Sequence, residues 1–347
     1  MRLDDLDTPA VICDLDVLER NLEEMAEHCR SLGLSFRAHT KAHKIPELAH
    51  QQVRSGSNGI VCQKLGEAEQ MVAASLDDIL IPYNIVGGKK LERLSRLARR
   101  ARITVAVDSE TTVRGIAQQA STDNVLINLL IEMDTGAARC GTQSPEETLD
   151  LARTIDSLPG VHFAGIMIYP SRADAKSLLD RTISLLREAG LEPESISGGG
   201  TGHEAISRDL GCTETRSGSY IWEGLSRIRS SEDLNPSRCP LSVLCTVVSV
   251  PTPGRVVIDG GMKTFASYPP VPYGHCIEHP EVRISKMSVE HGQLDASDSS
   301  HEFCVGERVR MIPLHQEMCL NLHDELVGVR GDRVEVIWTV AGRGKVQ

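Results

Sequence analysis

Three short segments of this 347-residue chain carry residue types whose spacing could do chemistry. In the first, RAHTKAHK (37–44), Lys41 is surrounded by other basic side chains. Neighbouring positive charge favours the neutral form of an amine, and a neutral lysine amine can capture an aldehyde covalently. The plainer interpretation is a solvated surface lysine. The functional interpretation therefore requires other residues that bind the remainder of a ligand whose aldehyde the lysine captures.

The second segment, SGGGTG (197–202), is a glycine-rich turn between a β-like run and a helical stretch. Its backbone N–H groups could converge on an anion, and Thr201 adds a hydroxyl. A glycine turn without a ligand is the alternative, but a second turn, SGSY (217–220), follows the next β-like run and favours a phosphate site. A lysine that captures an aldehyde, combined with a phosphate site, is what pyridoxal phosphate requires.

The third segment, His315-Gln316-Glu317, follows another β-like run. Residues i and i+2 of a strand face the same side, so the imidazole and the carboxylate could share a cation. A surface histidine beside a salt-bridging glutamate is the plainer interpretation. An oxygen ligand favours Mn²⁺ or Mg²⁺, whereas recruitment of the nearby Cys319 would favour Zn²⁺, and both stay open.

Periodicity indicates the elements that must position these residues. From about residue 14 to 225, short β-like runs alternate with amphipathic stretches such as 16–32. Eight strand candidates alternating with helices predict a parallel (β/α)₈ barrel of the TIM type, with a doubly wound open sheet as the main alternative. Barrel active sites lie at the C-terminal ends of the strands. The side chains expected there, besides the two glycine turns, are Lys41, Gln63, Arg139, Tyr169 and Ser197.

The pattern changes after about residue 235, where prolines and glycines become dense. β-like runs such as LSVLCTVVSV (241–250) then follow one another without helices between them. This indicates a C-terminal antiparallel β-domain, which the strand-like PAVICDL (9–15) is expected to join. The predicted boundaries are a barrel over 14–235 and a β-domain over 1–13 and 236–347 that carries the metal site.

Composition limits the classes of function. The 37 basic and 48 acidic residues give a net charge of −11, which argues against a nucleic-acid partner because phosphate backbones need clustered Lys and Arg. No apolar run approaches the roughly 20 residues of a membrane helix, and the acidic N-terminus does not resemble a signal peptide. We therefore expect a cytoplasmic protein without a membrane partner. Its ten cysteines contain no CxxC pair, so they read as reduced thiols that are mostly buried.

Several motifs, in order along nearly the whole chain, resemble the D-threonine aldolase and D-serine dehydratase family. These are fold-type III pyridoxal-phosphate enzymes with an alanine-racemase-like barrel. The motifs are LDTPAVICDLDVLERN (6–21), RAHTKAHK, GEAE (66–69), EMDTGAARCG (132–141), SGGGTG, DGGMKTF (259–265), VEHG (289–292) and PLHQEMCLNLHDEL (313–326).

The resemblance implies that Lys41 holds the cofactor and that His315 and Glu317 bind a divalent metal, where family members carry His-x-Cys or His-x-Asp. It favours Mn²⁺ or Mg²⁺ because Glu317 stands at the second-ligand position. The expected cofactor-binding residues are Lys41, Gln63, Arg139, Tyr169, Ser197, Thr201, Gly202, Gly218, Ser219 and Tyr220.

The implied reaction is metal-assisted retro-aldol cleavage of a β-hydroxy D-amino acid such as D-threonine, which yields glycine and an aldehyde. Lys41 would carry the cofactor, and His291 is a candidate base for the hydroxyl proton. The nearest alternative is a D-serine-type dehydratase; an amino-acid racemase and a non-catalytic pyridoxal-phosphate carrier are further ones. Because alanine-racemase-like folds build their site at a dimer interface, the resemblance also implies a homodimer.

Overall fold

The computed structural model describes residues 1–224, 232–268 and 271–347, and the chain forms two compact units. We call them the barrel unit and the β-unit. The barrel unit comprises Ala26–Lys41, Pro46–Gly218 and Lys345–Gln347. The β-unit comprises Met1–Met25, Ala42–Ile45 and Ser219–Gly344. Helix α1 (Leu15–Ser31) contributes residues to both units.

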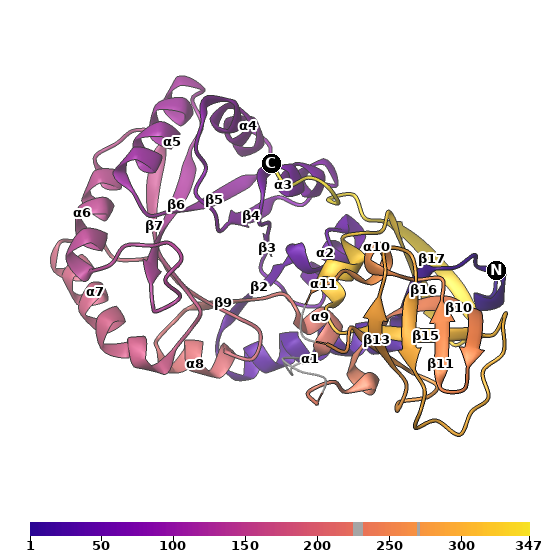
Figure 1. The fold of residues 1–347 in the computed structure, drawn as a ribbon. Coiled ribbons are helices and arrows are strands. Elements are labelled where there is room, and N and C mark those ends of the chain that lie inside the picture. Colours follow the sequence, from indigo (N-terminus) through magenta and orange to yellow (C-terminus); the bar gives the residue numbers. More distant parts are fainter. Residues whose placement is uncertain (225–231, 269–270) are drawn as a thin grey trace. The chain divides into compact units, whose positions relative to one another are not determined.

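Within the described residues, the barrel unit contains a closed barrel of eight parallel strands that follow one another in sequence order (Figure 1). They are β2 (Ser35–His39), β3 (Ile60–Val61), β4 (Asp78–Ile81), β5 (Arg102–Val107), β6 (Ile127–Asp134), β7 (Val161–Tyr169), β8 (Ser195–Gly199) and β9 (Glu214–Ser217). Pairing of the last strand with the first, with Ser35 opposite Glu214, closes the ring. The barrel prediction is confirmed, and the open sheet is excluded.

Helices connect successive barrel strands and lie outside them in Figure 1. They are α2 (Pro46–Arg54), α3 (Leu65–Ala73), α4 (Gly88–Ala98), α5 (Glu110–Thr122), α6 (Pro145–Asp156), α7 (Lys176–Glu188) and α8 (Glu204–Asp209). Local sequence fixes some of their starts. The Ser144 hydroxyl accepts the Glu147 N–H and Pro145 occupies the first turn, a combination that favours helix initiation at α6.

The barrel has two hydrophobic layers. Leu80 belongs to a small cluster, whereas Ile79 and Ile81, its neighbours on β4, belong to a larger one that includes side chains of the surrounding helices. Because successive side chains of a strand point to opposite faces, the small cluster lines the barrel interior. Its members are Val61, Leu80, Ala106, Leu130, Ala164 and Met167.

In the part of the β-unit that the structure describes, nine strands form one sheet in the order β11-β14-β13-β12-β15-β10-β1-β16-β17. The strands are β1 (Ala10–Asp14), β10 (Leu241–Thr252), β11 (Arg255–Ile258), β12 (Gly274–Cys276), β13 (Arg283–Met287), β14 (Gly292–Asp295), β15 (Arg308–Pro313), β16 (Glu325–Arg330) and β17 (Arg333–Thr339). Adjacent strands are antiparallel except for β1 and β16. The predicted antiparallel β-domain, joined by the N-terminal strand, is therefore confirmed.

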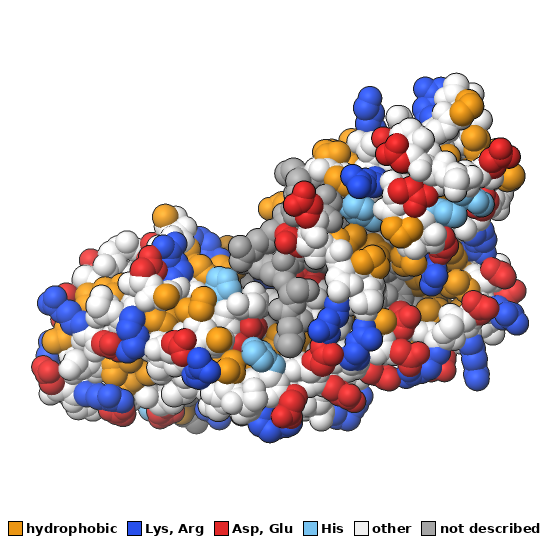
Figure 2. All heavy atoms as spheres, turned by 90° about the horizontal axis from the view of Figure 1, so that it is seen from below, with side chains coloured by type: hydrophobic (Ala, Val, Ile, Leu, Met, Phe, Trp, Pro, Cys, Tyr) orange, Lys and Arg blue, Asp and Glu red, His pale blue; other side chains and the backbone are white. Residues whose placement is uncertain are grey.

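Three short helices complete the β-unit within the described residues: α9 (Tyr220–Glu223), α10 (Met262–Phe265) and α11 (Gln316–Leu320). None of the described helices is long and apolar enough to cross a membrane. On the face drawn in Figure 2, Lys and Arg side chains are interspersed with Asp and Glu over the described residues. The ten cysteines are free thiols, and eight of them are buried.

Candidate active site

Lys41 lies directly after β2, in a short 3₁₀ turn over Thr40–Ala42, at the C-terminal end of a barrel strand as predicted. Its side chain is exposed. The adjacent Thr40 is buried, and its hydroxyl lies 2.9 Å from the carbonyl oxygen of Val61, the last residue of β3. The turn that presents the lysine is thus fastened to the neighbouring strand.

His39 and Gln63 lie beside this turn. The His39 Nε2 atom is 3.1 Å from Gln63 Oε1, and the Lys41 backbone N–H donates to His39 Nδ1 at 3.4 Å. Because Gln63 offers an acceptor oxygen and Nδ1 accepts, the imidazole carries its proton on Nε2. Burial, followed by the charges of Lys41 and Arg216, holds the pKa of His39 well below its usual range. The imidazole is therefore neutral at pH 7.

Arg216 of β9 is a buried cation that the sequence analysis missed. Its Nη1 donates to the carbonyl oxygen and the hydroxyl of Ser197 at 2.8 and 2.7 Å, and its Nη2 donates to the Ile168 carbonyl oxygen at 2.9 Å. A Cβ on Gly199 would lie 2.7 Å from this Nη2 and 3.3 Å from the Tyr169 ring. The glycine therefore allows Arg216 and Tyr169 to approach. The only sequence signal for Arg216 is its place directly before the SGSY turn.

The two glycine turns contact each other. The Gly218 N–H donates to Thr201 Oγ1 at 3.3 Å, which leaves the hydroxyl hydrogen of Thr201 able to donate to an anion. The Gly202 N–H and the Ser217 hydroxyl both donate to Glu204 Oε1, at 3.1 and 2.6 Å. The structure thus joins the two predicted turns and adds a buried carboxylate, Glu204, that was not predicted.

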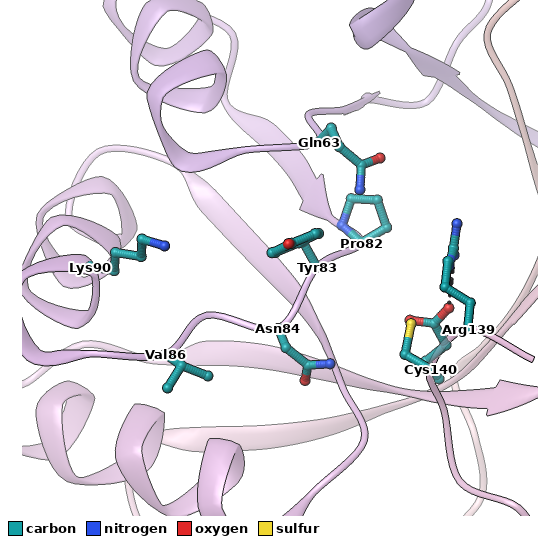
Figure 3. Close-up of a pocket in the computed structure, with 9 residues that line it drawn as sticks. Gln63, Pro82, Tyr83, Asn84, Val86, Lys90, Arg139 and Cys140 are labelled. Carbon is teal, nitrogen blue, oxygen red and sulfur yellow. Dashed lines mark hydrogen bonds and ion pairs between the residues drawn. The ribbon is translucent and has the colours of Figure 1, made fainter. Parts of the chain in front are cut away.

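A pocket of about 550 Å³ lies in the barrel unit (Figure 3). It is lined by Gln63, Pro82, Tyr83, Asn84, Val86, Lys90, Glu132, Arg139 and Cys140. In Figure 3, Tyr83 and Asn84 lie between Lys90 on one side and Arg139 and Cys140 on the other. The Arg139 guanidinium is 3.1 Å from the Glu132 carboxylate and 4.9 Å from the centroid of the Tyr169 ring. The lining thus combines two cations, Lys90 and Arg139, with one carboxylate, Glu132, that pairs with the arginine.

In the β-unit, the structure corrects the expected geometry of His315 and Glu317. β15 ends at Pro313, and His315 is the N-cap of α11, with its Nδ1 accepting the Met318 N–H at 3.4 Å. Glu317 lies in the first helical turn and accepts the Ser219 hydroxyl at 2.8 Å. The two residues therefore do not occupy positions i and i+2 of a strand, because the strand ends before them and the imidazole caps a helix.

The groups around this pair fit an oxygen-preferring cation better than a thiophilic one. Within the described residues, the buried Oδ1 of Asn321 has no hydrogen-bond partner, and Asn321 lies four residues after Glu317, on the same side of the helix. Cys319 is fully buried, its thiol donates to the Thr264 carbonyl oxygen at 3.2 Å, and burial raises the pKa of the thiol. A cysteine ligates a metal as its thiolate, and in this structure the Cys319 thiol is instead a hydrogen-bond donor to a backbone carbonyl oxygen.

The remaining predicted residues of the β-unit are Tyr220 and His291. Tyr220 is buried at the start of α9, directly after Ser219. His291 is exposed in the turn between β13 and β14, with its Nδ1 3.5 Å from the Ser288 hydroxyl oxygen. Ser219 and Glu317 are thus in contact with each other, whereas the side chain of His291 contacts Ser288, a residue of the same turn.

A closed β/α barrel with a lysine after its first strand and a glycine turn after its seventh defines an alanine-racemase-like protein. Residues 13–225 match the family profile "Alanine racemase, N-terminal domain", and residues 240–329 match the profile "Putative serine dehydratase domain".

Individual relatives sharpen this class. The chain is 35% identical to a D-threonine aldolase of Arthrobacter sp and 32% identical to a 3-hydroxy-D-aspartate aldolase of Paracoccus denitrificans, in each case over 98% of this chain and 93% of the relative. The crystal structure of a D-threonine aldolase from Filomicrobium marinum gives a TM-score of 0.89 at 34% identity, covering 100% of this chain and 98% of that one. A D-threo-3-hydroxyaspartate dehydratase from Delftia sp. HT23 gives 0.83 at 26% identity, covering 97% and 98%. The chain belongs to the D-threonine aldolase and serine dehydratase family of fold-type III pyridoxal-phosphate proteins.

Proposed function

We propose that the chain is a lyase that cleaves β-hydroxy D-amino acids of the D-threonine type to glycine and an aldehyde, with pyridoxal phosphate and a divalent metal. The observation that carries this proposal is the arrangement of Lys41, His39 and the joined turns at Thr201 and Gly218 around the same ends of the barrel strands. The aldolase relatives, similar over nearly the whole chain, support it.

The barrel residues fit the cofactor. A Cβ at Gly218 would lie 3.1 Å from the Cβ and the carbonyl oxygen of His39, so the glycine lets the second turn lie close to the end of β2, two residues before Lys41. The Lys41 amine can hold an aldehyde, and the Thr201 hydroxyl can donate to a phosphate. The rest of the proposed binding set is Gln63, Arg139, Tyr169, Ser197, Gly202, Gly218, Ser219 and Tyr220.

When bound, pyridoxal phosphate supplies an electron sink for the Cα–Cβ bond pair, and the metal supplies a Lewis acid for the substrate hydroxyl. The protein's own groups then hold and move protons. His291 is the proposed base that takes the proton of the β-hydroxyl group. Lys41 would hold on its Nζ atom the proton that returns to the α-carbon to complete glycine. Arg216 is held by three hydrogen bonds and provides a fixed positive charge beside Tyr169.

His315 and Glu317 are the proposed metal ligands, with Mn²⁺ or Mg²⁺ preferred over Zn²⁺. The carboxylate of Glu317 and the amide oxygen of Asn321 support a hard cation, and so does the buried thiol of Cys319, which donates to a backbone carbonyl oxygen. Because Nδ1 of His315 accepts the Met318 N–H, Nε2 is the nitrogen expected to ligate. We further propose a homodimer, on the basis of the family's fold.

Dehydration is the second candidate function. The Delftia dehydratase is similar over most of the chain, and structures of that enzyme include a cysteine variant described as being in the metal-free form. In this chain, the second metal ligand beside His315 could be the carboxylate of Glu317 or the buried thiol of Cys319. The carboxylate favours the aldolase.

The two functions differ in their products. Protein loaded with pyridoxal phosphate and Mn²⁺ is incubated with D-threonine and, separately, with D-serine. Aldol cleavage of D-threonine yields glycine and acetaldehyde, whereas dehydration yields 2-oxobutanoate and ammonia. We expect glycine from D-threonine; 2-oxobutanoate as the main product would replace the proposal with the dehydratase.

A further inference from the structure

Three side chains of metal-ligating type meet in the β-unit outside the His315–Glu317 pair. His279 lies in the connection between β12 and β13, whereas His301 and Glu307 lie in the connection between β14 and β15. Their ligand atoms all lie within 4.8 Å of one another. We propose that these three residues form a second metal site, which takes one divalent transition-metal ion of the Zn²⁺, Ni²⁺ or Cu²⁺ class.

The side chains are already held in contact. His301 Nε2 lies 2.7 Å from Glu307 Oε1, and the rings of His279 and His301 are stacked with centroids 4.2 Å apart. Phe303 packs edge-on against both imidazoles, with centroid distances of 5.2 and 4.7 Å. The aromatic ring therefore packs on both imidazoles and keeps the two histidines close together.

The backbone and outer partners fix the carboxylate. Glu307 Oε2 accepts the Cys304 N–H at 2.9 Å, and the Glu307 carbonyl oxygen accepts the N–H of Val247 on β10 at 2.8 Å. On the other connection, the His279 carbonyl oxygen accepts the Val282 N–H at 2.8 Å. Outer hydrogen bonds of this kind orient ligands and strengthen metal sites.

The donor set determines which ions fit. Two imidazoles and one carboxylate suit Zn²⁺, Cu²⁺ or Ni²⁺, whereas Mg²⁺ and Mn²⁺ prefer oxygen. Zinc–nitrogen bonds of about 2.0–2.1 Å place the ligand atoms of a tetrahedral site roughly 3.3 Å from one another. The ligand atoms here lie within 4.8 Å of one another, so a zinc ion would need to shorten any of these distances by at most roughly 1.5 Å. Stacked rings cannot both aim at one ion, so one imidazole must turn. Three protein ligands leave a fourth position for water.

The surroundings suit a cation. A second carboxylate, Glu281, lies two residues after His279 and accepts the Ser299 hydroxyl. His301 and Phe303 also line an open surface pocket of about 670 Å³, which gives an ion and its water access. A bound ion would fasten the β14–β15 connection to the β12–β13 connection and would stabilise the folded chain by preferential binding.

The test is zinc binding to the full-length protein after removal of metals with a chelator. Zn²⁺ is titrated in competition with a chromophoric chelator, for the wild type and for His301→Ala and His279→Ala. The matched control is His162→Ala. His162 makes the same 2.7 Å contact with a glutamate, Glu194, but among the described residues it belongs to no group of three ligands. All four proteins keep His315 and Glu317, so a difference between them reports the proposed site.

We expect the wild type and His162→Ala each to bind one equivalent of zinc tightly. His301→Ala and His279→Ala should bind that equivalent at least about 100-fold more weakly, because loss of a residue that only hydrogen-bonds to a metal ligand already weakens metal binding about 10–100-fold. Zinc should also raise the midpoint of thermal unfolding in the first two proteins and not in the last two. Equal zinc affinity in all four proteins, or the same loss in His162→Ala, would overturn the proposal. Both histidines lie in surface connections, and if one variant fails to fold by circular dichroism, the other decides.

Discussion

Arg37 provides a sharp test of how the barrel supports its site. It lies on β2, the strand that precedes the turn containing Lys41, and it pairs with Asp78 on β4 at 2.6 Å and with Glu214 on β9 at 2.9 Å. Glu214 also accepts the Ser197 hydroxyl at 2.6 Å. Replacing Arg37 with Met keeps much of the side-chain volume and removes the positive charge that forms ion pairs with residues of β4 and β9.

The magnitude follows from burial. The side chains of Arg37 and Glu214 are only 13% and 10% exposed, so the variant leaves a carboxylate that is poorly solvated and has lost its cation. Removing one partner of a buried ion pair costs about 3–5 kcal/mol. The exposed pair of Arg114 and Glu110, at 58% and 59%, is the matched control, and Arg114→Met should change stability by no more than about 0.5 kcal/mol.

The assay is urea unfolding followed by far-ultraviolet circular dichroism, because both tryptophans, Trp222 and Trp338, belong to the β-unit and would not report the barrel. Adding Glu214→Gln to Arg37→Met removes the stranded charge while keeping an acceptor for Ser197, so part of the lost stability should return. If Arg37→Met loses no more stability than the Arg114→Met control, or if adding Glu214→Gln restores none of the lost stability, the buried ion pair does not have this effect.

Three further predictions concern the site itself. Lys41→Ala should lose the visible absorbance of the bound cofactor and at least about 10²–10⁴-fold in D-threonine cleavage, and retention of both would contradict its role. Glu317→Gln should need more Mn²⁺ for half-maximal cleavage, by about 10–100-fold, whereas the exposed Glu325→Gln should not; equal metal requirements would exclude Glu317 as a ligand. Because the pKa of His39 is lowered in the folded chain, the imidazole is protonated at a higher pH in the unfolded chain than in the folded one. The free energy of unfolding therefore keeps its full value above about pH 6.5 and decreases below it by up to about 1.4 kcal/mol per pH unit. His39→Gln should flatten that fall between pH 7.5 and 5.5 in urea unfolding relative to His162→Gln, and parallel pH profiles would disprove this sign.

Sequence periodicity was sufficient for the fold because the barrel repeats one local pattern. Each β-like run followed by an amphipathic stretch became a strand and a helix, and parallel closure then brought the strand ends together. Lys41 and the turn containing Thr201 could therefore be placed at the same end of the barrel before the structure was known. The domain boundaries at 13–14 and 235–236, the cytoplasmic location and the homodimer stay predictions.

Residues whose importance depends on long-range contacts could not be found in this way. Arg216 is one of them, because neighbouring strands bring it to Ser197, and His279 meets His301 and Glu307 only through the pairing of β12 to β15. The geometry of His315 was mistaken for a different reason. Pro313 cannot donate a further strand hydrogen bond, so it marks the end of β15, and the next residues start a helix.

The most direct test of the proposed function is the release of glycine from the two enantiomers of threonine by protein loaded with pyridoxal phosphate, measured with Mn²⁺ and again after chelation. We expect stoichiometric glycine and acetaldehyde from D-threonine, little from L-threonine, and a loss of turnover on chelation that Mn²⁺ restores. Absence of glycine from D-threonine, or equal release from both enantiomers regardless of metal, would contradict it.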